Sequence, residues 1–138
     1  MKTELVPYLN FNGNTEEALN FYKDALNGEI VLINRFSESP MQVDEDYKDK
    51  IIHARLVFGG SNMMMFSDGM KGREIPIEGN IQLSIQMEDA AELEKTFNNL
   101  SAGGTITMPL AVQFWGDLFG MLKDKFGVNW MFNCPQKK

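Results

Sequence analysis

The sequence predicts one α+β domain built from two modules, each with the order strand, helix, strand, strand, strand. Three observations lead to this prediction. Short apolar and β-branched segments are separated by glycine-containing turns, each of two helical patterns follows a strand directly, and the order of elements repeats. The first module covers about residues 4–68, a charged linker about 69–78, and the second module about 79–134.

The first module is expected to hold one helix and four strands. Asn14 is a favoured N-cap residue with Glu17 three positions later, and Asn27-Gly28 supplies the left-handed backbone that ends many helices. The glycine-rich turn of residues 59–62 joins two strands into a hairpin, whereas the polar stretch of residues 37–50 is expected to be an exposed loop. The expected helix covers residues 15–26, and the expected strands cover residues 5–11, 29–36, 51–58 and 63–67.

The second module is expected to repeat this order. Glu88 and Asp89 open a helix that carries apolar residues at helical spacing, and Gly103-Gly104 ends it. The turn of residues 124–127 joins the last two strands. The expected strands cover residues 81–87, 105–112, 116–123 and 128–133.

The charge balance excludes two classes of partner. With 13 basic and 19 acidic residues the formal net charge is −6, and such a surface repels phosphate backbones and anionic lipid headgroups. No segment approaches the ~20 apolar residues of a membrane span, and the start of the chain lacks the apolar stretch of a secretion signal. We therefore expect neither a nucleic acid nor a membrane as partner. Because Cys134 is the only cysteine, no internal disulfide can form, and the reducing cytoplasm is the expected location.

Strand alternation predicts which side chains face a ligand. In residues 51–58, His53 and Arg55 share one face, and the opposite, helix-covered face holds Ile52, Ala54, Leu56 and Phe58. In residues 81–87 the polar face holds Gln82, Ser84 and Gln86. By the same rule Met64 and Phe66 point one way while Met63 and Met65 point the other, so only one of these pairs can meet a ligand.

Three stretches carry a resemblance to a known family. They are the run of residues 7–14 (Pro-Tyr-Leu-Asn-Phe-Asn-Gly-Asn) with its continuation through Glu17-Ala18 and Phe21-Tyr22, residues 52–56 (Ile-His-Ala-Arg-Leu), and residues 114–130, which begin Phe-Trp-Gly-Asp and end Phe-Gly-Val-Asn-Trp. With these motifs the chain resembles PhnB-like proteins of the vicinal oxygen chelate superfamily, which includes glyoxalases, bleomycin-resistance proteins and extradiol dioxygenases.

The resemblance implies a glyoxalase-like fold. In it, two βαβββ modules form a cupped, eight-stranded mixed sheet with helices on the convex face and a ligand in the concavity, and homodimers are usual. Metal-using members carry His or Glu ligands at positions that fall here near Pro7 or Tyr8, near Asn80 or Gln82, and near Met131. A phenol, amides and a thioether are poor substitutes for these ligands, so we expect no metal site and no cofactor.

The candidate catalytic residue is His53, the only histidine, which can act as a general acid or base while Arg55 holds an anionic or carbonyl group. Its alternative role is structural, within the sheet or at a subunit contact. The candidate ligand-binding residues share aromatic, sulfur or amide character, and an ordinary core is the alternative for the aromatic ones. These candidates are Arg55, Gln82, Phe114, Trp115, Phe119, Met121 and Met131.

These residues favour metal-independent binding of a small aromatic or cationic molecule in the cup. The alternative is a lyase or isomerase of the glyoxalase/dioxygenase type that uses His53 or a recruited divalent metal. A third possibility is an interaction module whose cup is closed by a partner chain. No glycine-rich strand-to-helix turn followed by an acid is present to hold a nucleotide or S-adenosylmethionine.

Overall fold

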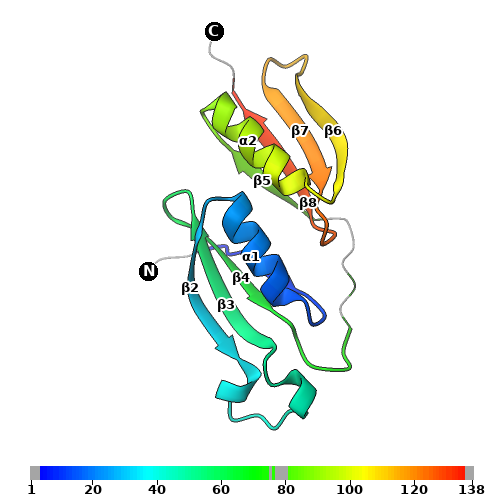
Figure 1. The fold of residues 1–138 in the computed structure, drawn as a ribbon. Coiled ribbons are helices and arrows are strands. Elements are labelled where there is room, and N and C mark those ends of the chain that lie inside the picture. The colour runs from blue at the N-terminus through cyan, green and yellow to red at the C-terminus, as the bar shows by residue number, and fades with distance from the viewer. Residues whose placement is uncertain (1–3, 75, 77–80, 136–138) are drawn as a thin grey trace. The chain divides into compact units, whose positions relative to one another are not determined.

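The computed structural model describes residues 4–74, 76 and 81–135. Asn80 and linker residues 75, 77 and 78 lie outside this described part. The chain divides into two compact units, residues 1–76 and 77–138, called module 1 and module 2 here. Each module consists of a four-stranded mixed sheet with one long helix packed on it (Figure 1), and the predicted α+β class is confirmed.

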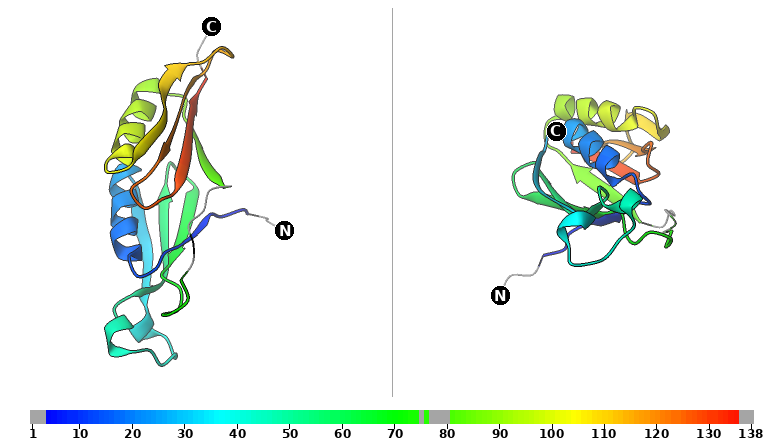
Figure 2. Two further views of the ribbon diagram at one scale, coloured as in Figure 1. Left: turned by 90° about the vertical axis from the view of Figure 1, so that its right-hand side faces the viewer. Right: turned by 60° about the horizontal axis from the view of Figure 1, so that its bottom comes forward.

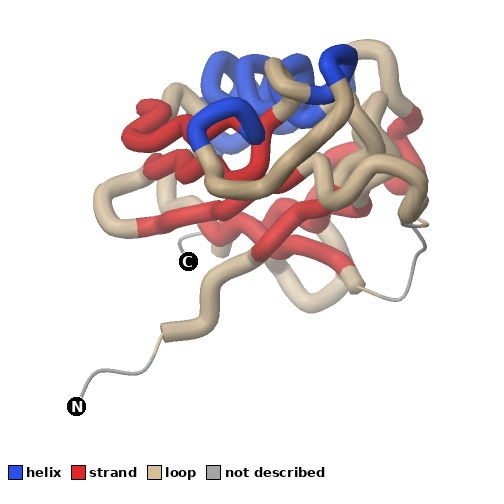
Figure 3. The backbone as a smooth tube through the Cα atoms, turned by 90° about the horizontal axis from the view of Figure 1, so that it is seen from below, coloured by secondary structure: helices blue, strands red, loops and turns tan. Residues whose placement is uncertain are grey.

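Module 1 has the spatial strand order β1-β4-β3-β2, with β1 parallel to β4 and the other neighbours antiparallel. Its helix covers one face of the sheet and leaves the other without a helix (Figures 2 and 3). The stretch expected to be a simple loop also contains two 3-10 helices, η1 and η2. The elements are β1 (Tyr8–Asn10), α1 (Thr15–Ala25), β2 (Glu29–Arg35), η1 (Phe36–Glu38), η2 (Glu45–Tyr47), β3 (Ile51–Phe58) and β4 (Asn62–Ser67).

Helix α1 begins at the predicted residue and ends within one residue of the predicted end, but its first turn is capped differently from the expectation. Asn27 has φ 52°, and the N–H of Gly28 donates to the carbonyl of Lys23 at 2.8 Å, so the Asn-Gly pair satisfies carbonyls of the last turn. At the other end the Asn14 side chain makes no cap hydrogen bond. Asn14 is the N-cap residue, as expected, but Asp68, and not the Asn14 side chain, accepts the N–H of Thr15, at 2.9 Å.

The face of module 1 beneath α1 forms its core. Ala54, Leu56, Met64 and Phe66 are buried there, as alternation predicts. Two of the residues expected there are only half-buried: Phe58 at the end of β3, and Ile52, whose neighbour Ile51 is buried instead. A register shift at Asn34/Arg35 pairs Arg35 with Ile51, so Ile52 is an extra residue that interrupts the alternation.

Module 2 repeats the arrangement with the order β5-β8-β7-β6, in which only β5 and β8 are parallel. Asp89 caps its helix by accepting the N–H groups of Ala91 and Glu92, as expected. Leu93, Phe97 and Leu100 turn inward onto the sheet. The elements are β5 (Gln82–Gln86), α2 (Ala90–Ser101), β6 (Thr105–Val112), β7 (Leu118–Lys123) and β8 (Asn129–Cys134).

Candidate functional site

In module 2 the sheet face away from α2 presents rows of polar and thioether side chains. Directly paired strand residues share a face, so the register fixes the rows. The central row runs Ser84, Met131, Met121, Met108. The rows beside it run Gln82, Asn129, Lys123, Thr105 and Gln86, Asn133, Phe119, Ala111.

Three aromatic side chains lie at one edge of this face. The Trp115 ring contacts Phe119 edge-on with centroids 5.6 Å apart, and Phe114 contacts Trp115 edge-on at 4.9 Å. Trp115 is 49% exposed and Phe114 is 95% exposed. Neither ring therefore belongs to the core, whereas Phe119 is half-buried on the face itself.

A hydrogen-bonded chain fixes the polar groups next to these rings. The amide nitrogen of Asn133 donates to Asp117 Oδ2 at 3.2 Å and to Gln86 Oε1 at 3.1 Å, and Gln86 donates in turn to Ser84 Oγ at 3.3 Å. Both amide hydrogens of Asn133 are thereby used, and its Oδ1 remains an acceptor. Because Asn133 pairs with Phe119, the Asp117 carboxylate lies beside the rings.

The open face of module 1 brings His53 and Arg55 together with Tyr8, a residue that sequence reasoning considered only as a metal position. The Tyr8 hydroxyl lies 3.1 Å from His53 Nδ1, and Arg55 Nε donates to His53 Nε2 at 3.2 Å. Tyr8 is 47% exposed, and the Tyr8 and His53 rings are tilted by 39° at 5.7 Å.

The hydrogen bonds define the protonation state of His53. A guanidinium only donates, so Nε2 must be the unprotonated nitrogen and the single proton of the neutral ring lies on Nδ1. That N–H donates to the Tyr8 oxygen, which leaves the hydroxyl hydrogen of Tyr8 available. Burial and the nearby charge of Arg55 lower the pKa of His53 below its ordinary value of 6.5, and so favour the neutral ring.

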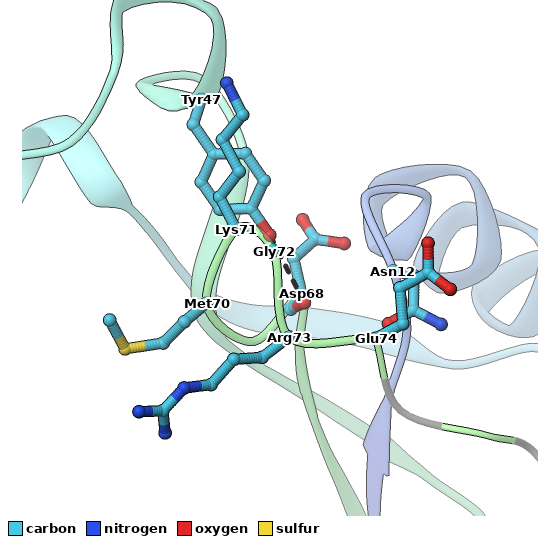
Figure 4. A pocket seen from close by; sticks show the side chains of 8 residues that line it. All are labelled: Asn12, Tyr47, Asp68, Met70, Lys71, Gly72, Arg73 and Glu74. Atoms are coloured by element: carbon cyan, nitrogen blue, oxygen red, sulfur yellow. Dashed lines mark hydrogen bonds between the residues drawn. The ribbon is translucent and has the colours of Figure 1, made fainter.

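A separate pocket of about 420 Å³ lies in module 1 between η2 and the segment after β4 (Figure 4). Several of its polar groups are engaged within module 1: Tyr47 donates to the carbonyl of Gly69 at 2.8 Å, and Lys71 contacts Asp44 and Asp46. Asp68 is buried and accepts three backbone N–H groups. These contacts hold the loop in shape, and we assign no chemistry to the pocket.

Comparison with known proteins decides the family. Residues 3–132 match the 3-demethylubiquinone-9 3-methyltransferase family. Protein YjdN of Escherichia coli is 33% identical over 144 residues, which cover 97% of either chain. The chain belongs to this PhnB-like family.

Solved structures agree with this assignment. Protein PA1353 from Pseudomonas aeruginosa is 43% identical with a TM-score of 0.85, covering 99% of this chain and 100% of that one. The PhnB protein of Bacillus cereus is 29% identical with a TM-score of 0.79, over 96% and 99%. A glyoxylase/bleomycin resistance protein/dioxygenase domain from Frankia, 13% identical over 99% of both chains with a TM-score of 0.68, shows the same fold.

The donor chemistry of this PhnB-like chain does not fit a catalytic metal. Tyr8, Gln82 and Met131 at the compared positions offer a phenol, an amide and a thioether. Among residues 4–74, 76 and 81–135, no group of three His, Cys, Asp or Glu side chains is placed to hold an ion. We derive no step through a metal.

The family name implies a methyl donor, and the strand-to-helix turns of the PhnB-like modules do not fit S-adenosylmethionine. In module 1 the N–H of Gly13 already donates to Asp68 at 3.0 Å, and in module 2 Asp89 occupies the first N–H groups of α2. In both turns a carboxylate of the chain already occupies amides that a nucleoside ligand would need. No helix within the described ranges is long and apolar enough to cross a membrane.

Proposed function

We propose that this PhnB-like protein binds a small aromatic or cationic molecule, without a metal ion, on the open face of module 2. The observation that carries the proposal is the Asp117 carboxylate fixed beside the Trp115–Phe119 ring pair. A carboxylate with exposed ring faces attracts an organic cation through charge and cation–π contact. The net charge of −6 favours the same class of ligand.

The remaining side chains of this face support the proposed ligand class. Met121 and Met131 are directly paired and half-buried, so they offer a flexible apolar surface to a ring or an alkyl chain. The amide of Gln82 lies at the end of the next row and can bond a polar substituent. Phe114, next to Trp115, can close over the ligand from the edge.

The test uses tryptophan fluorescence with benzyltrimethylammonium as cation and benzoate as anion of similar size. Trp115 is the reporter, because Trp130 is 1% exposed and donates its indole N–H to Asp124. We expect saturable quenching by the cation, lost in Trp115→Phe and weakened about tenfold in Asp117→Asn. Asp24→Asn removes one charge from exposed α1 as the control. Saturable quenching of Trp115 by benzoate as strong as that by the cation, or an unchanged affinity of the Asp117→Asn variant for the cation, would sink the proposal.

A second candidate function rests on the Tyr8–His53–Arg55 contacts. In this alternative the protein is a lyase or isomerase in which the unprotonated Nε2 of His53 takes a proton from the substrate after the substrate displaces the N–H of Arg55, while the Tyr8 oxygen continues to accept Nδ1–H. In the other version of this enzyme, a recruited divalent metal takes the place of His53 in the reaction. Turnover that survives chelation but is lost in His53→Ala supports the metal-free version, and turnover that requires added metal supports the other.

We further propose that the protein acts as a cytoplasmic homodimer, as the family resemblance implies. Cys134 is buried and is the single cysteine of the sequence, and a chain without an internal disulfide suits a reducing compartment. Light scattering measures the mass of the protein as it elutes from a size-exclusion column at micromolar concentration. A mass of 15.7 kDa, that of one chain, would identify a monomer and contradict the dimer.

A further inference from the structure

We propose that the open face of module 1 is a second binding site, which holds the carboxylate of a small organic acid between the Tyr8 hydroxyl and the Arg55 guanidinium. His53 acts as the positioning residue between the two donors. This site lies on different strands from the aromatic face of module 2 and takes a ligand of opposite charge, so it stands or fails independently of the proposed function.

The guanidinium of Arg55 supplies the main donors. Only its Nε bonds within the described part of the chain, to His53, which leaves both terminal nitrogens for a ligand. Two parallel N–H groups match the two oxygens of a carboxylate. Arg35 shows the contrast: its terminal nitrogens contact Glu16 at 3.0 and 2.8 Å. Arg55 contacts no carboxylate among the described residues, although the chain has 19 acidic residues.

The Tyr8 hydroxyl supplies a further donor because of the state of its neighbour. Since Nδ1–H of His53 donates to the Tyr8 oxygen, the hydroxyl hydrogen points elsewhere, and no described residue accepts it. Such a hydrogen can bond a carboxylate oxygen. A protonated His53 would direct an N–H at the Nε–H of Arg55, so the neutral ring is the one that holds both donors in place.

The register places the two donors on either side of an apolar floor. Tyr8 and Arg55 both pair with Met65, one from β1 and the other from β3, so the three side chains form one row across the sheet. Neighbouring strands are about 4.8 Å apart, which leaves a gap of about 10 Å between the outer backbones. Met65 and its face neighbour Met63 are half-buried, and they offer thioether surface to the body of the acid.

The test is imidazole NMR on the full-length, ¹⁵N-labelled chain, in which the single histidine gives one unambiguous set of signals. The probe is benzoate, and benzamide is its uncharged counterpart. We expect an Nδ1–H neutral ring in the free protein. Benzoate should then shift the His53 signals saturably, and benzamide should bind at least tenfold more weakly, because charge-assisted hydrogen bonds are lost.

Two variants and one control separate this site from general charge effects. Arg55→Gln should weaken benzoate binding about tenfold or more and Tyr8→Phe about fivefold, while Arg73→Gln, which removes an exposed arginine from the same module, should leave it unchanged. Both target side chains are exposed, and the amide spectrum checks that each variant is folded. An Nε2–H ring in the free protein, no saturable His53 shift, or equal losses in all three variants each overturns the proposal.

Discussion

Asp68 and Ile51 are joined by two hydrogen bonds in the interior of module 1. The backbone N–H of Ile51 donates to Asp68 Oδ2 at 2.8 Å, and the N–H of Asp68 donates to the Ile51 carbonyl at 2.9 Å. The other carboxylate oxygen accepts Gly13 and Thr15. One buried side chain therefore connects the end of β4 to the start of β3 and to the start of α1.

Replacing this carboxylate should destabilise the protein strongly. Asp68→Ala leaves three backbone N–H groups without their acceptor, and an unsatisfied buried donor costs about 1–3 kcal/mol. We expect a loss of about 3–5 kcal/mol in the free energy of unfolding, measured with urea. The control, Asp89→Ala, removes an exposed helix cap and should cost about 1 kcal/mol. Similar losses for both would contradict this role of Asp68.

The role of Asp68 shows which parts of the fold the sequence predicts. Strand and helix positions follow from local alternation and turn residues, and β3 and β6 have the expected bounds. A buried acceptor that serves amides 53 and 17 residues away leaves no local pattern. Alternation accordingly fails at Ile52, where a bulge depends on the partner strand.

The candidate sites also have features that local alternation predicts and features that depend on distant strand pairing. Period-two alternation correctly separates His53 and Arg55 from the buried face, and Met64 from Met63. The contact of Tyr8 with His53 joins residues 45 positions apart and depends on the parallel register of β1 with β4, which sequence spacing does not encode. In the sequence, Tyr8 draws attention only because it lies near a position where metal-using members of the superfamily carry a metal ligand.

Two neighbouring methionines should differ in their effect on stability. Met64 is 2% exposed beneath α1, whereas Met63 is half-buried on the open face. Met64→Ala removes packed core atoms and should lower the free energy of unfolding by about 2–4 kcal/mol. Met63→Ala should cost less than about 1 kcal/mol. Thermal or urea unfolding measures the free energy of unfolding of both variants. A larger decrease for Met63→Ala than for Met64→Ala would reverse the assigned faces.

Gly104 should tolerate no side chain. A Cβ there would lie 2.3 Å from the carbonyl oxygen of Lys123 and 2.9 Å from backbone atoms of Asp124, so β6 would have to move away from the end of β7. We expect Gly104→Ala to cost about 3 kcal/mol or more. At Gly60 a Cβ meets nothing within 4 Å, and only its φ of +90° opposes the change, at about 1–2 kcal/mol. Urea unfolding compares the two, and equal losses would mean that the close approach at Gly104 is relieved at little cost.

The titration of His53 should occur below its ordinary pKa of 6.5, because burial and the charge of Arg55 both disfavour the protonated ring. In the unfolded chain the ring has its ordinary pKa, so on acidification the unfolded state binds the proton first. The stability contributed by the neutral ring is therefore complete above about pH 6.5 and is lost as the pH falls toward the pKa of the folded protein. A His53→Gln variant lacks this loss, and its stability should fall less than that of the unaltered protein over the same range.

The imidazole signals of the single histidine measure this titration directly. Arg55→Gln removes the repelling charge and should raise the midpoint toward 6.5, while burial keeps it from rising fully. Arg73→Gln, the matched loss of charge elsewhere in module 1, should leave the midpoint where it is. A midpoint at or above 6.5 in the unaltered protein would show that the folded structure does not disfavour the protonated ring of His53. The hydrogen bond that Arg55 donates to Nε2 could not then persist at neutral pH, because a protonated Nε2 cannot accept it.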